Sequence, residues 1–149
     1  MAQTFSNLLT HVIFSTKDRF PLISSELRPD LLAFMGGIVR ELNGKALTVG
    51  GTADHVHLLV NLPPTLAIAD ALRVVKANSS KWVHETKGRS KFAWQAGYGA
   101  FSVSQSNAAS VIKYIAGQEE HHRGFTFQEE LLTLLKKHGI PYDERYIWV

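Results

Sequence analysis

Two histidines separated by one residue form the part of this sequence with the clearest chemical potential. They lie in Asp54-His55-Val56-His57-Leu58-Leu59-Val60, which is typical of a short β-strand. Successive side chains on a strand point to opposite faces, so His55 and His57 share one face. Two imidazoles held side by side on a rigid backbone are a natural start for a divalent metal site. The pattern alone is weak, because many such pairs are strand residues with ordinary hydrogen bonds.

A second stretch, residues 110–118, predicts a helix that places Tyr114 and Gln118 on one face, since they are four residues apart. We interpret His55, His57 and Gln118 as metal ligands and Tyr114 as a nucleophile beside them. A tyrosine hydroxyl has a pKa of about 10, so a metal or base must favour the phenolate. The metal would also polarise a phosphate oxygen. The simpler alternatives are a tyrosine that only packs, with its hydroxyl at the rim, and a solvated glutamine.

Other polar residues near these positions have simpler roles. His121 and His122 follow Gln118 closely. They are either further ligands, for example of a zinc site, or histidines that favour a helix end. Glu119 and Glu120 are expected to be solvated. Asp54 precedes His55 and is expected to face away from both histidines, in a turn or a supporting role.

Basic residues gather in the middle of the chain, where they either contact phosphates or form a solvated helix face. The predicted DNA-binding set is Arg73, Lys76, Lys81, Lys87, Arg89 and Lys91. The aromatic residues Trp82, Trp94 and Tyr98 lie nearby, and we expect them to belong to the core more than to a base-stacking surface.

The composition predicts one globular domain spanning residues 1–149. Of its 149 residues, 45% are hydrophobic, which is enough for a core and argues against disorder. The absence of cysteine excludes disulfides and thiolate metal sites and fits a cytoplasmic protein. No apolar run approaches the roughly 18 residues of a membrane span, and residues 1–7 lack signal-peptide features. The net charge of +3 permits a nucleic-acid partner without requiring one.

Hydrophobic periodicity and turn residues predict eight elements in the order β-α-β-β-α-β-α-α. The first six predict an α+β ferredoxin-like sandwich, in which a four-stranded antiparallel sheet carries two helices on one face. The tyrosine-bearing helix, capped by Ser106 or Asn107, and a final helix follow. The second sheet face is expected to stay partly open as a place for a DNA strand, and the aromatic tail 142–149 is expected to dock. The predicted strands span 8–15, 45–52, 54–61 and 98–104, and the main helices span 26–42, 65–86 and 126–138.

Several longer motifs, in this order, resemble one family over essentially the whole chain. The sequence resembles the HUH single-tyrosine transposases of the smallest bacterial and archaeal insertion sequences, including relatives associated with repeated palindromes. The motifs are Phe14-Ser15-Thr16-Lys17, residues 54–60, residues 94–104, residues 114–122, Phe127-Gln128-Glu129-Glu130 and Tyr146-Ile147-Trp148.

The resemblance implies a DNA transposase that cleaves and rejoins single-stranded DNA next to hairpins at insertion-sequence ends. It implies that His55 and His57 bind Mg²⁺ or Mn²⁺ with Gln118 as third ligand. It also implies that Tyr114 forms a 5′-phosphotyrosine link and leaves a free 3′-OH. The family works as a homodimer, and its tyrosine helix can serve the partner's histidines. Gly117, inside the tyrosine helix, would suit such a movement.

Two other functions stay open from the residues themselves. One is a non-catalytic ferredoxin-like module that binds single-stranded nucleic acid, whose histidines are structural; it would bind in EDTA and cleave nothing. The other is metal-dependent hydrolysis with Tyr114 as a bystander, in which cleavage would survive Tyr114→Phe.

Overall fold

A four-stranded antiparallel sheet in the order β2-β3-β1-β4 forms the centre of the molecule. The structure is a computed structural model that describes residues 2–149. The strands are β1 (Leu9–Ser15), β2 (Lys45–Gly51), β3 (His55–Asn61) and β4 (Gly99–Ser102). The central strands β1 and β3 pair along their whole length, from Leu9 opposite Asn61 to Ser15 opposite His55. This topology confirms the predicted α+β ferredoxin-like sandwich.

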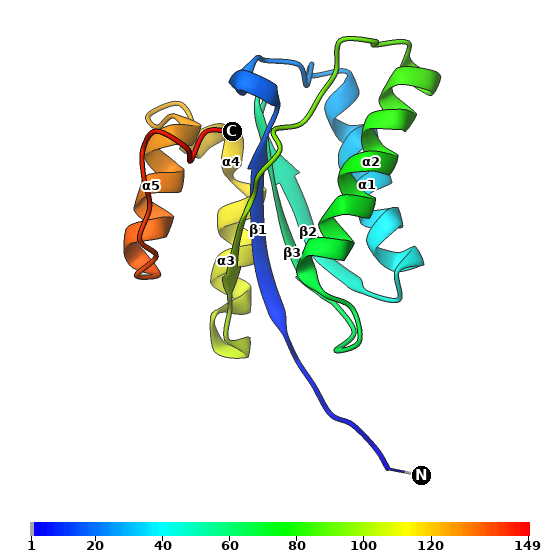
Figure 1. The fold of residues 1–149 in the computed structure, drawn as a ribbon, viewed down its shortest axis with the longest axis vertical. Coiled ribbons are helices and arrows are strands. Elements are labelled where there is room, and N and C mark those ends of the chain that lie inside the picture. The colour runs from blue at the N-terminus through cyan, green and yellow to red at the C-terminus, as the bar shows by residue number, and fades with distance from the viewer. Residues whose placement is uncertain (1) are drawn as a thin grey trace.

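Two long helices, α1 (Leu27–Glu41) and α2 (Ile68–Lys87), cover one face of the sheet (Figure 1). Their apolar sides pack on alternate residues of the central strands, including Val12, Phe14 and Leu58. Pro29 lies in the first turn of α1, where its missing N–H removes no hydrogen bond. Helix α2 ends at Gly88, whose φ of 66° is a conformation that glycine adopts without strain.

The opposite face of the sheet is also covered, so the expectation of a partly open face is wrong. Helices α3 (Ala108–Ala116), α4 (Gln118–His121) and α5 (Phe127–Lys137) lie on that side (Figure 1). The reason is that this face also carries apolar strand positions, which lie beside the histidines. Ile13 is buried with Phe127 of α5, and Leu59 is buried with Ile115 of α3. Strands with two apolar faces need a layer on each side.

The predicted tyrosine helix is interrupted at Gly117, which separates α3 from α4. Gly117 has φ −95° and ψ 20°, outside regular helix geometry, and glycine is a weak helix former. Asn107 takes the N-cap position, as predicted, but its side chain makes no capping hydrogen bond. The break places Gln118 at the start of a new short helix while its side chain stays buried.

A capping box fixes the N-terminus of helix α5, and the C-terminal tail of the chain packs against this helix. Thr126 and Glu129 form a reciprocal capping box, with the Glu129 N–H 3.1 Å from the Thr126 hydroxyl. The tail docks as predicted, because Tyr142 and Trp148 pack on the cluster that contains Phe127. Arg19 also donates to the Trp148 carbonyl at 3.1 Å.

Two short 3₁₀ turns, Lys17–Arg19 and Gln105–Asn107, complete the fold. Within residues 2–149, no helix combines the length and apolar character needed to cross a membrane.

Candidate metal and tyrosine site

The two histidines of β3 lie fully buried beneath the second helix layer, on the same side of the sheet as predicted. Their Nε2 atoms converge on one carboxylate oxygen, Oε1 of Glu130 in α5. The distances are 2.9 Å from His57 and 3.3 Å from His55. Both side chains are 0% exposed. Strand pairing with β1 on one side and β2 on the other fixes their backbone.

The opposite ring nitrogen of each histidine is held by a neighbouring side chain. His55 Nδ1 lies 2.7 Å from Asp54 Oδ1, and Asp54 in turn accepts from the Thr52 hydroxyl at 3.1 Å. Asp54 therefore supports His55, and the expectation that it faces away from this histidine is wrong. His57 Nδ1 lies 2.7 Å from Nε2 of His11, a buried β1 residue. Such partners fix the orientation of metal-binding imidazoles.

Gln118 reaches the histidines across the break at Gly117. Its Oε1 lies 3.1 Å from His55 Nε2, and its Nε2 donates to Glu130 Oε2 at 3.2 Å. The side chain is 1% exposed, which excludes the solvated alternative. The structure therefore brings Gln118 and both histidines together.

Tyr114 points into the same cluster from α3. Its hydroxyl donates a hydrogen bond to Glu130 Oε2 and lies 3.5 Å from His121 Nε2. The tyrosine and His57 rings meet edge to face, with centroids 5.7 Å apart. Burial and the adjacent Glu130 carboxylate raise the pKa of Tyr114 above its ordinary value. Without a cation nearby, the phenol therefore holds its proton.

The residue at the centre of the site, Glu130, had no predicted role. Its Oε1 also lies 3.0 Å from His122 Nε2, and its side chain is almost completely buried. One signal in the sequence could have revealed it. Glu130 follows Phe127 by three residues and precedes Leu131 and Leu134, so it lies on the apolar face of the final helix. A carboxylate on that stripe is buried and therefore needs partners.

The charges in the cluster compensate one another. Burial alone would raise the pKa of Glu130, but hydrogen bonds from His122, His55 and His57 outweigh it and hold that pKa well below its usual range. For His55, burial alone would lower the pKa, because it disfavours the charged imidazolium. The hydrogen bonds with Asp54 and Glu130 outweigh burial and raise this pKa to about 9. Burial lowers the pKa of His57. The site therefore holds an ionised carboxylate beside a protonated His55 at neutral pH.

The donor set suits a divalent metal ion. His55, His57, His122 and Glu130 each offer a ligand atom, and these atoms all lie within 4.8 Å of one another. Gln118 adds an amide oxygen beside His55. Neighbouring ligands of an octahedral cation with bonds of about 2.1 Å lie about 3 Å apart. The distances of 2.9–3.3 Å from Glu130 Oε1 to the three imidazoles match that spacing.

The predicted DNA-binding cluster lies on the opposite side of the sheet from Tyr114, because most of it belongs to α2 and the loop that follows. Three members already have partners within the chain. Lys76 Nζ donates to the carbonyls of residues 95, 96 and 97 at 3.1, 3.1 and 2.5 Å. Lys87 pairs with Asp30 at 2.7 Å, and Arg73 contacts Asp70 at 3.6 Å. The structure thus leaves this set apart from the histidines.

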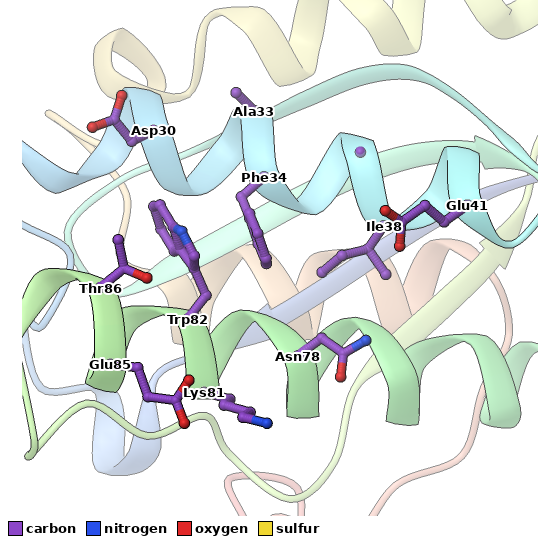
Figure 2. A pocket seen from close by; sticks show the side chains of 11 residues that line it. Asp30, Ala33, Phe34, Ile38, Glu41, Asn78, Lys81, Trp82, Glu85 and Thr86 are labelled. Carbon is purple, nitrogen blue, oxygen red and sulfur yellow. The ribbon is translucent and has the colours of Figure 1, made fainter.

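A surface groove between α1 and α2 contains none of the residues of the histidine and tyrosine cluster, although Lys81 of the predicted DNA-binding set lines it (Figure 2). Trp82 stacks on Phe34 at its floor, with ring centroids 4.6 Å apart. The groove carries three carboxylates, Asp30, Glu41 and Glu85, beside Lys81. That charge does not favour a phosphate backbone. Trp82 and Trp94 both pack against the main core, as expected, but Tyr98 is 42% exposed, so that part of the expectation is wrong.

Comparison with known proteins gives a consistent result. The family model described as "Transposase IS200 like" matches residues 4–118. The transposase of insertion sequence IS200 from Salmonella typhimurium is 29% identical over 133 residues, covering 83% of this chain and 84% of the relative. The ISDra2 transposase TnpA of Deinococcus radiodurans is 27% identical over 116 residues, covering 74% of this chain and 83% of the relative.

Two solved structures share the fold. A protein from Deinococcus radiodurans R1 described as a transposase has a TM-score of 0.64 at 21% identity, covering 77% of this chain and 93% of that chain. A REP-associated tyrosine transposase bound to a REP hairpin has a TM-score of 0.57 at 13% identity. The match covers 85% of this chain and 76% of that chain. At these identities the likeness supports the fold. The matched family region ends at Gln118, so His122 and Glu130 lie beyond it.

Proposed function

Because this chain belongs to the IS200-like transposase family, we propose that it cleaves and rejoins single-stranded DNA, with Tyr114 as the nucleophile. One observation carries this proposal. The Tyr114 hydroxyl lies in the same buried cluster as His55, His57 and Gln118, although these residues come from separate elements. A tyrosine that only packed in the core would not need to point its hydroxyl at a group of metal-binding side chains.

In the proposed reaction, the Tyr114 oxygen attacks a backbone phosphate. A bond forms between this oxygen and phosphorus, and the bond from phosphorus to the 3′ oxygen breaks. The products are a 5′-phosphotyrosine and a strand that ends in a 3′-OH. Tyr114 donates a hydrogen bond to Glu130 Oε2, so this carboxylate oxygen can accept the phenol proton as the oxygen–phosphorus bond forms. The reverse attack by a 3′-OH returns the proton and rejoins a strand.

His55, His57 and Gln118 would hold the cation, Mg²⁺ or Mn²⁺, in this proposal. A divalent cation bound there supplies Lewis-acid polarisation of the phosphate and stabilises the developing charge. Asp54 and His11 orient the two imidazoles through their Nδ1 atoms.

The proposed substrate is single-stranded DNA with hairpin ends, and the proposed assembly is a homodimer. The REP-associated tyrosine transposase that shares this fold is bound to a REP hairpin, which supports a hairpin substrate here. Within one chain, Tyr114 already lies beside its own His57. We therefore propose that each subunit uses its own tyrosine, even within a dimer.

The test uses single-stranded DNA from both sides of the gene, incubated with Mg²⁺ or Mn²⁺ and separated on a denaturing gel. We expect a covalent protein–DNA band that disappears in Tyr114→Phe and in His57→Ala. Tyr146→Phe is the matched control, because Tyr146 is 66% exposed and distant in sequence from the site. Retarded DNA without an adduct or cleavage would indicate the binding module. Cleavage that survives Tyr114→Phe would indicate metal-dependent hydrolysis.

A further inference from the structure

We propose that helix α5 and the loop before it complete the metal site, with His122 and Glu130 as two further ligands beside His55, His57 and Gln118. This inference rests on the proposed function and extends its ligand set. Neither added residue falls within the stretch that matches the family model, residues 4–118. The cation would therefore connect the sheet to the C-terminal part of the chain.

The arrangement of the three imidazoles carries the argument. Each has its Nδ1 held by another group. His55 Nδ1 lies 2.7 Å from the Asp54 carboxylate, and His57 Nδ1 lies 2.7 Å from His11 Nε2. His122 Nδ1 donates to the Phe125 carbonyl at 2.6 Å, so this ring carries a proton at Nδ1. Histidines that ligate metals are typically held in this way, by a carboxylate, a backbone carbonyl or a similar group.

The other nitrogen of all three rings faces a single point. The Nε2 atoms of His55, His57 and His122 lie 3.3, 2.9 and 3.0 Å from Glu130 Oε1. A cation among these atoms would take a lone pair from each ring and from the carboxylate, in place of the separate contacts that link them here. A shared metal ion satisfies all these atoms together.

Glu130 is held in place by the packing of its own helix. Phe127 and Leu131 flank it and are buried against the sheet. The capping box of Thr126 and Glu129 fixes the first turn. Its side chain is 2% exposed, so the carboxylate is presented by a rigid element and not by a mobile loop. A ligand held in this way loses little conformational entropy when the cation binds.

The extended donor set has a consequence for metal choice. Three imidazole nitrogens with a carboxylate and an amide oxygen suit Mn²⁺ better than Mg²⁺, which prefers oxygen ligands and retains its waters. We therefore expect Mn²⁺ to bind this chain more tightly than Mg²⁺.

The experiment measures Mn²⁺ binding to the full chain by calorimetry, without DNA. The variants are Glu130→Gln, His122→Gln, His57→Ala and the control Glu120→Gln. Glu120 is two residues from Gln118, and its side chain is 75% exposed. We expect Glu130→Gln and His122→Gln each to weaken Mn²⁺ binding at least about tenfold and Glu120→Gln to leave it unchanged. Pulsed electron paramagnetic resonance should count three coordinated imidazoles in the parent protein and two in His122→Gln.

Each outcome separates this inference from the proposed function. Loss of binding in His57→Ala, with unchanged or tighter binding in both Glu130→Gln and His122→Gln, would overturn the inference and leave the proposed function standing. Unchanged binding in His57→Ala would instead remove the metal site on which both depend. Circular dichroism in EDTA confirms folding of each variant. If Glu130→Gln does not fold, His122→Gln and its imidazole count decide the matter.

Discussion

The Tyr114 hydroxyl donates a hydrogen bond to Oε2 of Glu130, a residue 16 positions later in the chain on another helix. The other oxygen of the same carboxylate faces His55, His57 and His122. One side chain thus connects the proposed nucleophile with the proposed metal ligands. Small changes at Glu130 should therefore affect both nucleophile activation and metal binding.

Glu130→Gln should slow adduct formation even when Mn²⁺ saturates the protein. The amide keeps the size of the side chain but is a far weaker proton acceptor for Tyr114. We expect a loss in the rate that stays below the roughly 10²–10⁴-fold usual for a positioned base, because the histidines hold the pKa of Glu130 low. Single-turnover adduct formation at several Mn²⁺ concentrations measures it, with Glu120→Gln as control. A rate that recovers fully at high Mn²⁺ would restrict Glu130 to metal binding.

Mixing two inactive variants should not restore adduct formation if each subunit uses its own tyrosine. Tyr114→Phe keeps the histidines, and His57→Ala keeps the tyrosine. In this structure Tyr114 and His57 meet within one chain, with ring centroids 5.7 Å apart. The mixture should therefore stay inactive on the denaturing gel, after light scattering has confirmed that mixed dimers form. Recovery of up to about a quarter of the activity would instead show that the tyrosine serves its partner.

The buried His11 should make the protein less stable in mild acid. Burial, with a smaller effect from His57, lowers the pKa of His11 to about 3, against about 6.5 in an unfolded chain. Between these values the unfolded state binds more protons. The contribution of neutral His11 is therefore complete above about pH 6.5 and falls as the pH drops towards 3. Urea unfolding in EDTA should lose about 1–3 kcal/mol between pH 7 and 4.5 from this group.

The matched variant His11→Gln isolates that effect. Gln retains polar atoms but does not titrate, so the loss of stability between pH 7 and 4.5 should be smaller than in the parent protein. Equal losses in both proteins would assign the acid sensitivity to other groups.

Gly50→Ala should displace the tyrosine helix from the sheet. A Cβ at Gly50 would lie 2.4 Å from the Ile115 backbone oxygen, so α3 must shift. We expect a destabilisation of about 1–3 kcal/mol and loss of adduct formation, because Tyr114 precedes Ile115 directly. Gly37→Ala is the control, since its Cβ would meet nothing within 4 Å and it lies within α1. That change should stabilise the protein by about 0.4–1 kcal/mol. Equal melting temperatures for Gly50→Ala and Gly37→Ala would contradict the predicted contact between a Cβ at Gly50 and α3.

The exposed loop residues Arg89 and Lys91 are the best remaining test of the predicted DNA-binding set. Unlike Arg73 and Lys87, neither has an ion pair among residues 2–149. Replacing both with Gln should weaken binding of single-stranded DNA and reduce the salt slope by about 0.7 for each lost phosphate contact. Fluorescence anisotropy at several salt concentrations measures both, with Lys136→Gln and Lys137→Gln as controls. An unchanged slope would place the DNA elsewhere.

Local sequence patterns were sufficient for most of the elements and for the side of the sheet on which the proposed site residues lie. Alternation along β1 and β3 placed His55 and His57 on one face, because side-chain direction in a strand depends only on position along the chain. Helical periodicity and capping residues located α1, α2 and α5 to within a few residues. The spacing of Tyr114 and Gln118 predicted that both would face the same region, which the structure confirms despite the break at Gly117.

Tertiary structure decided which distant groups complete the site. Glu130 and His122 come close to His55 only because α5 packs across the second face of the sheet, a face that the sequence led us to expect partly open. Lys76 is bound to backbone carbonyls for a similar reason, since the loop at 95–97 folds over α2. Local propensities act over a few residues. The packing of one layer on another depends on the shape and polarity of surfaces assembled from the whole chain.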